Sequence, residues 1–155
     1  MKQLLAILSV ICLVTTANSQ INSTTKNKSK MKLNAGVITT KLAESKAFYT
    51  NYLGFGVTFE NEFYLLLHTP DRGSEISFLL PNHPSQQPFF HKPFGREGMF
   101  LTIEVDDVDK IYYYFKDMGG EIKIEIRNEP WGDRHFAIED PNGIGIDIVK
   151  YSPVQ

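Results

Sequence analysis

Histidine and cysteine side chains are few in this sequence, and their spacing is irregular. The histidines, His68, His83, His91 and His135, share no metal-ligand spacing. The single cysteine, Cys12, lies in an apolar N-terminal run. Neither the G-x-S-x-G motif of serine hydrolases nor a nucleotide-binding glycine motif occurs. No catalytic residue is identified, and the sequence does not decide whether the protein is an enzyme.

The remaining candidates lie in the second half of the chain. Glu104 and Asp147 are of the right type for an acid–base pair of carboxylates. His135 follows Arg134 and lies near Trp131, so it is a candidate for titration near neutral pH. The simpler alternatives are a polar pocket lining for the carboxylates and a surface position for the histidine.

The composition is that of one ordinary globular domain. The chain has 155 residues, of which 42% are hydrophobic and 22% charged, with a formal net charge of −2. It therefore lacks the basic excess that drives binding to nucleic acid, and nucleic acid is excluded as a partner.

The N-terminal residues are predicted to lie outside the fold. A lysine, an apolar run and then small residues give residues 1–19 the pattern of a signal peptide. The polar segment 20–32 is predicted to be a disordered linker. We expect export, either to the periplasm or by secretion, and no membrane contact after cleavage. An uncleaved anchor is the alternative, although the run is short for a bilayer span.

The rest, residues 33–151, reads as two copies of one unit, 33–80 and 99–150. Each copy has a strand, a helix and three strands, which predicts two βαβββ modules. A shift of 66 residues lays Phe48-Tyr49 on Tyr114-Phe115 and Gly54 on Gly120, and a shift of 70 lays Gly73 on Gly143. A proline-rich crossover joins the copies. Its Phe89, Phe90 and Phe94 either pin it to the fold or belong to a dimer interface.

Alternation along the strands separates a face under the helix from an opposite face, here called the front. Ile144, Ile146 and Ile148 face the helix, whereas Asp147 lies on the front. Phe100, Thr102 and Glu104 are also assigned to the front. Such a mixture suits the wall of a small-molecule cleft. A solvated sheet face is the alternative.

Three segments together resemble the vicinal oxygen chelate superfamily, which includes glyoxalase I, bleomycin-resistance proteins and extradiol dioxygenases. They are Phe48-Tyr49 with Leu53-Gly54-Phe55, Val105–Asp109, and Trp131–Phe136 with Asp140-Pro141-Asn142-Gly143. The resemblance implies an α+β fold in which two βαβββ modules form a curved mixed-sheet cup with the helices outside. It also implies that a second subunit often completes the cup, so a homodimer is expected.

The resemblance places metal ligands of the superfamily at Asn34, Ser77, Phe100 and Asp147. Only Asp147 is a competent ligand, since a transition metal usually needs three or four histidine, carboxylate or thiolate groups. We therefore expect no metal and no cofactor. In bleomycin-resistance-like relatives aromatic residues hold planar ligand groups, which supports Trp131 and Phe100 as contacts, although Trp131 could instead cap the sheet.

The leading hypothesis is an exported protein that binds a small aromatic or amphipathic molecule in a metal-free cleft. The predicted ligand-binding residues are Asn34, Ser77, Phe100, Glu104, Trp131, Arg134 and Asp147. Arg134 would pair with an anionic ligand or with Asp133 or Glu139. The alternatives are a glyoxalase-like lyase or isomerase that uses a divalent ion, and an interaction domain with no ligand.

Overall fold

The computed structural model describes residues 31–152. The predicted signal peptide and residues 20–30 of the predicted linker lie outside the described residues. From Lys32 onward the chain forms one compact unit. None of the helices in the described part is long and apolar enough to cross a membrane.

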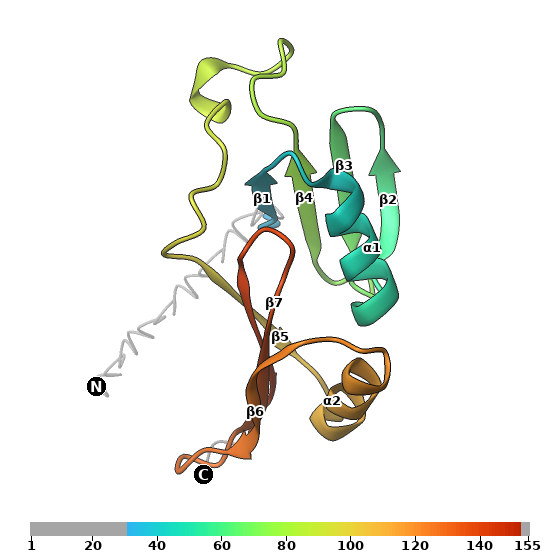
Figure 1. The fold of residues 1–155 in the computed structure, drawn as a ribbon, viewed down its shortest axis with the longest axis vertical. Helices are drawn as coiled ribbons and strands as arrows, with labels where there is room; N and C mark the ends of the chain where they lie inside the picture. Colours follow the sequence, from blue (N-terminus) through green and yellow to red (C-terminus); the bar gives the residue numbers. More distant parts are fainter. Residues whose placement is uncertain (1–30, 153–155) are drawn as a thin grey trace, which may run out of the picture. The chain divides into compact units, whose positions relative to one another are not determined.

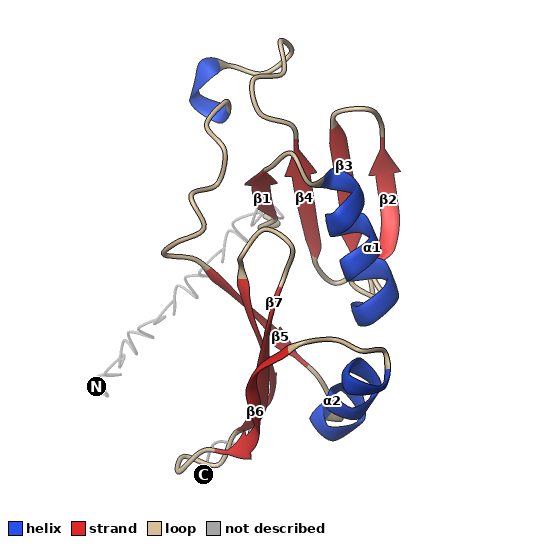
Figure 2. Cartoon of the chain, in the orientation of Figure 1, coloured by secondary structure: helices blue, strands red, loops and turns tan. Residues whose placement is uncertain are grey.

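Two modules follow one another with the same order of elements (Figures 1 and 2). The first contains β1 (Ala35–Ile38), α1 (Leu42–Leu53), β2 (Gly56–Glu60), β3 (Tyr64–His68) and β4 (Glu75–Leu79). After the crossover, with its short 3-10 helix η1 (Pro88–Phe90), come β5 (Phe100–Glu104), α2 (Val108–Asp117), β6 (Ile122–Asn128), β7 (Arg134–Glu139) and β8 (Gly145–Lys150). The predicted α+β fold with two βαβββ modules is confirmed.

Each module forms its own four-stranded mixed sheet. The strand orders are β1-β4-β3-β2 and β5-β8-β7-β6, and only the pairs β1–β4 and β5–β8 are parallel. The pairing also agrees with the predicted repeat. Ala35 pairs with Ile76, and Leu101 pairs with Ile146, so the partners lie 66 and 70 residues further along the chain, as in the sequence comparison.

Local sequence explains where the helices begin and end. Helix α1 ends at Gly54, whose φ of 67° is left-handed and costs glycine little. Helix α2 begins after Asp107, whose side chain accepts a hydrogen bond from the Lys110 backbone N–H at 3.0 Å. After α2 the left-handed residue is Gly119, with a φ of 75°, rather than Gly120. The second helix thus ends earlier than the repeat predicts.

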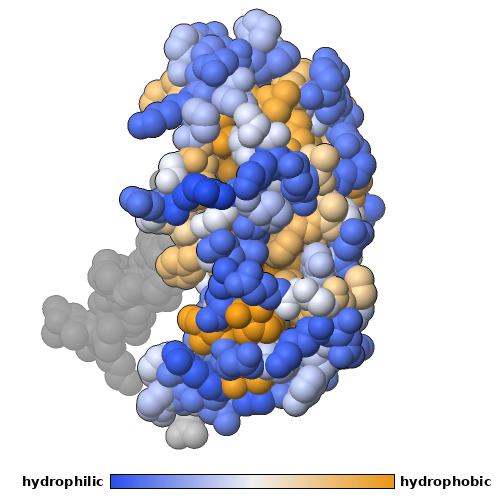
Figure 3. All heavy atoms as spheres, viewed as in Figure 1, coloured by the Kyte–Doolittle hydropathy of each residue, from blue (hydrophilic) through white to orange (hydrophobic). Residues whose placement is uncertain are grey.

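The core lies between the helices and the back faces of the two sheets. Phe78, Ile146 and Ile148 are fully buried, as the alternation predicts. The front faces are less covered, and Phe100 is 71% exposed. The space-filling view in Figure 3 shows apolar atoms among polar residues on one side of the molecule. In the crossover Phe94 packs on the core, whereas Phe89 is 86% exposed and does not pin the segment.

A buried polar contact joins the two modules. The β7–β8 turn, Asp140-Pro141-Asn142-Gly143, lies against the start of α1 in the other module. Asn142 accepts a hydrogen bond from the Thr39 hydroxyl at 2.7 Å and donates to the Ser45 hydroxyl at 2.9 Å. The Tyr49 hydroxyl donates to Asp140 at 3.3 Å. We call these five side chains, Thr39, Ser45, Tyr49, Asp140 and Asn142, the polar seam.

The polar seam is satisfied internally as well as between modules. Asp140 accepts hydrogen bonds from the backbone N–H groups of Asn142 and Ile144 at 2.8 and 2.9 Å. No buried side-chain nitrogen or oxygen within residues 31–152 lacks a partner. Burial, and next the nearby Asp140 carboxylate, raise the pKa of the Tyr49 hydroxyl, so it stays a proton donor. Removing one member would therefore leave buried groups without partners.

We predict that Asn142→Ala destabilises the protein by about 2 kcal/mol or more, because Thr39, Ser45 and Asp140 each lose a buried partner. Urea unfolding followed by circular dichroism measures the change. Asn51→Ala is the matched control: Asn51 is exposed on α1, and its replacement should change the free energy of unfolding by less than about 0.5 kcal/mol. Equal losses in the two variants would contradict the assigned role of the polar seam.

Candidate functional site

The front face of the second sheet carries most of the predicted site. Phe100, Thr102 and Glu104 project from β5 on the side away from the core. Thr102 lies opposite Asp147 on β8. Asp147 in turn lies opposite Ala137 on β7, two residues from His135. The parallel and antiparallel pairings thus bring an aromatic ring, a hydroxyl and ionisable groups onto one surface.

His135 is held between two carboxylates on this surface. Its Nδ1 lies 2.7 Å from Asp147 Oδ1, and its Nε2 lies 2.8 Å from Glu129 Oε1. Arg127 Nε donates to the same Glu129 oxygen at 2.6 Å. A carboxylate only accepts hydrogen bonds, so both ring nitrogens donate when the imidazole is protonated. The four side chains then carry two positive and two negative charges.

The surroundings favour the charged form of this network. Burial disfavours the imidazolium, but hydrogen bonds to Asp147 and Glu129 outweigh it and raise the pKa of His135. The hydrogen bond from His135, followed by that from Arg127, lowers the pKa of Glu129. The front face therefore has fixed charges in a set geometry, a feature that orients polar parts of a ligand.

Two aromatic side chains of the predicted site are open to solvent. Trp131 is 69% exposed in the β6–β7 turn, and its ring N–H donates to Asp133 at 2.9 Å. Phe100 lies at the start of β5, and 71% of it is exposed. Exposed rings of this size are available for stacking on a planar ligand.

Arg134 is bound to a carboxylate within the chain, but to Asp109 rather than to Asp133 or Glu139. Its guanidinium donates to both carboxylate oxygens of Asp109, on α2, at 2.8 and 2.6 Å, and to Asn128 at 3.1 Å. The hydrogen bond from Arg134 lowers the pKa of Asp109 and keeps it ionised. This bidentate pair fastens α2 to β7, so a ligand would have to compete with it.

The first-module residues of the predicted site lie on the other sheet. The Asn34 amide donates to Glu75 at 3.3 Å, just before β1. The Ser77 hydroxyl, on β4, donates to the Ala35 carbonyl at 3.4 Å. Their hydrogen bonds stay within the first module, whereas Asp147 is bonded to His135 in the second. Asn34 and Ser77 thus share one local environment, and Phe100, Glu104 and Asp147 share another.

The donor set does not suit a metal ion at the position implied by the resemblance. Asp147 is the one charged ligand among the four positions, and its carboxylate is engaged by His135. Throughout the described range, no three His, Cys, Asp or Glu side chains converge in a metal-binding arrangement. The imidazole of His135 lies between the Asp147 and Glu129 carboxylates, and each carboxylate binds a different ring nitrogen. The two carboxylates are therefore held apart.

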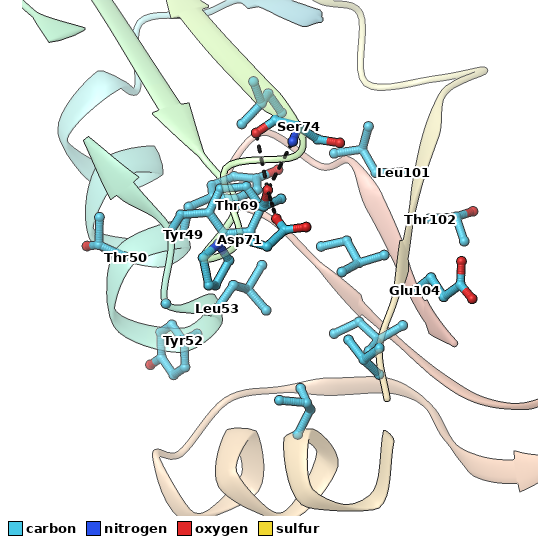
Figure 4. A pocket seen from close by; sticks show the side chains of 18 of the residues that line it. Tyr49, Thr50, Tyr52, Leu53, Thr69, Asp71, Ser74, Leu101, Thr102 and Glu104 are labelled. Carbon is cyan, nitrogen blue, oxygen red and sulfur yellow. Dashed lines mark hydrogen bonds between the residues drawn. The ribbon is translucent and has the colours of Figure 1, made fainter. Parts of the chain in front are cut away.

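A cavity of about 950 Å³ lies elsewhere, between the end of α1, the β3–β4 turn, β5 and α2. Glu104 is the predicted site residue that lines it. Figure 4 shows Leu53 and Asp71 on one side of this space and Leu101 on β5 opposite, while Thr102 and Glu104 project from the far side of that strand. The cavity and the charged front face are therefore different surfaces that meet at β5.

Sequence reasoning identified His135 but missed Glu129, the second carboxylate that fixes it. The β6–β7 pairing, in which Arg127 lies opposite His135, brings Glu129 within reach. That register contains shifts between Ile122 and Arg127. Because of these shifts, a strict alternation of residues along β6 assigns some side chains to the wrong face of the sheet. The turn sequence Glu129–Asp133 between two strands was the available signal.

We predict that His135 makes stability depend on pH. Because its pKa is raised in the folded protein, its contribution is fully present below about pH 6.5 and is lost as the pH rises through the folded pKa. As the pH rises from about 6.5 through the folded pKa of His135, the thermal midpoint of the protein should therefore fall by a few degrees. His135→Gln should remove that fall. His83→Gln is the control, because the hydrogen bonds of His83 are to Ser85 and involve no carboxylate. An unchanged pH profile in His135→Gln would contradict the assignment.

Comparisons with known proteins find the same fold in solved structures. A member of the glyoxalase/bleomycin resistance protein/dioxygenase superfamily from Sphaerobacter thermophilus DSM 20745 has 24% identity and a TM-score of 0.62, with 79% of this chain and 98% of that chain covered. A bleomycin-binding protein solved with bleomycin has 20% identity and a TM-score of 0.57, covering 79% and 100%. A Nocardioides protein of the same superfamily description has 17% identity and a TM-score of 0.65, covering 81% and 89%. At these identities the structures show the shared fold.

Comparison with curated protein sequences finds no significant match. The family model described as Glyoxalase/Bleomycin resistance protein/Dioxygenase superfamily matches residues 32–148, which include both modules. The chain therefore belongs to the glyoxalase/bleomycin resistance protein/dioxygenase superfamily, also called the vicinal oxygen chelate superfamily.

Proposed function

We propose that the protein is an exported binding protein that sequesters a small aromatic or amphipathic molecule on the front face of its second sheet. The observation that carries the proposal is the His135 network on a sheet face with an exposed aromatic ring at each end. Fixed charges from Asp147, His135 and Glu129 orient the polar part of a ligand, and Phe100 at one end of the face and Trp131 at the other stack on separate planar parts. Binding of this kind needs no metal and no chemical step.

The comparisons support this class of function. The chain has the fold of a protein solved with bleomycin bound, so a member of this fold binds a small molecule. Stacking and desolvation with one or two polar contacts are enough for micromolar affinity, about −8 kcal/mol. Export rests on the pattern of residues 1–19 and completes the proposal.

The proposal includes a homodimer. Strand β1 is an edge of the first sheet and β5 is an edge of the second, so each has backbone groups with no strand beside them in the described part of the chain. The first sheet also carries the partly exposed rings of Phe59 and Tyr64. A second copy that lays this apolar surface over the charged front of its partner would enclose the ligand on both sides.

We predict that bleomycin, the first probe, quenches the fluorescence of Trp131, the single tryptophan of the chain. Phe100→Ala should weaken binding about tenfold in calorimetry, because one stacking surface is lost. Phe89→Ala is the matched control: Phe89 is also exposed but lies in the crossover. The proposal fails if neither bleomycin nor anilinonaphthalene sulfonate binds, or if both variants bind equally weakly.

For the dimer, we predict that light scattering of the purified protein gives twice the mass of one chain. Phe59→Lys should shift the protein toward the monomer, because it places a charge on the exposed surface of the first sheet. Glu62→Lys, at a neighbouring exposed turn, is the control. A monomer at all concentrations in the unsubstituted protein would refute the dimer and leave a one-sided binding surface.

A further inference from the structure

We infer that the cavity between α1 and α2 is a second binding site, selective for a small organic cation with an apolar body, such as a hydrophobic amine. It is distinct from the front face of the proposed function, and the two are tested separately. A comparison of this cavity with the polar seam shows why it is open and what it would bind.

The polar seam and the cavity occupy equivalent places in the two modules. In the polar seam the β7–β8 turn lies against Thr39, Ser45 and Tyr49. The shift of 66 residues that relates β1 to β5 places Val105, Ile111 and Phe115 at the equivalent positions. The β3–β4 turn is the counterpart of the β7–β8 turn, and it lines the cavity together with Val105 and Ile111.

The chemistry of the two places is opposite. Three hydroxyl groups in the polar seam are replaced by three apolar side chains, so a polar turn has nothing to bond there. The β3–β4 turn instead satisfies itself: Asp71 accepts hydrogen bonds from the Thr69 hydroxyl at 2.5 Å and from the Gly73 backbone N–H at 3.0 Å. The turn does not fill the space, and about 950 Å³ stays open.

The larger part of the cavity lining is apolar and aromatic, although hydroxyl and carboxylate groups also line it. Leu53 and Phe55 come from the end of α1, Leu101 and Ile103 from β5, and Tyr114 from α2. The Tyr114 hydroxyl donates to the Asn51 carbonyl at 3.1 Å, which ties α2 to α1 at the edge of the cavity. A space of this size and lining suits a drug-sized apolar body.

All charged residues that line the cavity are acidic: Asp71, Glu75 and Asp106, with Glu104 at the β5 edge, where its side chain projects onto the front face. Hydrogen bonds from Thr69 and from the Gly73 backbone lower the pKa of Asp71, which keeps it ionised, and Figure 4 shows its carboxylate facing the cavity. Glu104 and Asp106 form no ion pair among residues 31–152. The negative potential favours a cation and repels an anion, and the tyrosine rings add cation–π attraction.

The test uses three probes of one shape: phenylbutylamine, phenylbutanol and phenylbutyrate. We predict that calorimetry on the purified protein at neutral pH finds the amine bound about tenfold or more tighter than the alcohol, with the carboxylate weakest. The double variant Asp71→Asn with Asp106→Asn should remove the preference for the amine but leave the alcohol affinity within about twofold. The asparagine introduced by Asp71→Asn keeps an acceptor oxygen, so the turn should hold its shape.

Two controls make the result specific. The double variant Glu62→Gln with Asp117→Asn removes the same charge from exposed positions outside the cavity and should leave amine binding unchanged. NMR places the ligand: the amine should shift the methyl signals of Leu53, Leu101 and Ile111, and leave the indole signal of Trp131 unmoved. The inference is overturned if the amine binds no tighter than the alcohol, if both double variants weaken it equally, or if only Trp131 shifts. This last result would favour the front face.

Discussion

The arrangement of the two modules depends on a buried polar contact more than on any single apolar one. Asp140 and Asn142 reach from the second module to the start of α1, where Thr39, Ser45 and Tyr49 present hydroxyl groups to them. Apolar side chains can pack in several relative orientations, whereas hydrogen bonds require particular distances and angles. The polar seam therefore helps to specify how the two modules meet, together with the ring contacts of Phe48 and Tyr52 with Phe115.

Hydrogen bonds also fix the geometry of the charged front face, which is more exposed than the polar seam. His135 is fixed by Asp147 on the adjacent strand and by Glu129 beyond the end of β6, so three elements define the position of one ring. The network places paired charges beside open aromatic surface. Such an arrangement suits the binding of a small molecule that we propose. Arg134, by contrast, stabilises the fold through Asp109.

Sequence reasoning recovered the fold because the repeat and the alternation are local signals that survive in each module. The pairings Ala35/Ile76 and Leu101/Ile146 follow the predicted shifts, and the helix-facing isoleucines are buried. The site was only partly accessible. Asp140-Pro141-Asn142-Gly143 was recognised as a family motif, but its partners lie about a hundred residues away. Glu129 was missed because β6 is irregular, and the cavity was missed because no single segment encodes it.

The duplication gives the chain two equivalent contacts between its modules, and the polar seam is the one built from buried side-chain hydrogen bonds. Because the polar seam already joins the modules, the residues at the equivalent place, the cavity, can change more freely in sequence. Substitutions at Asp71 or Asp106 would change the charge of the cavity and leave the polar seam intact. A duplicated fold can thus use one of two equivalent contacts for stability and keep the other, here the cavity, open for a ligand.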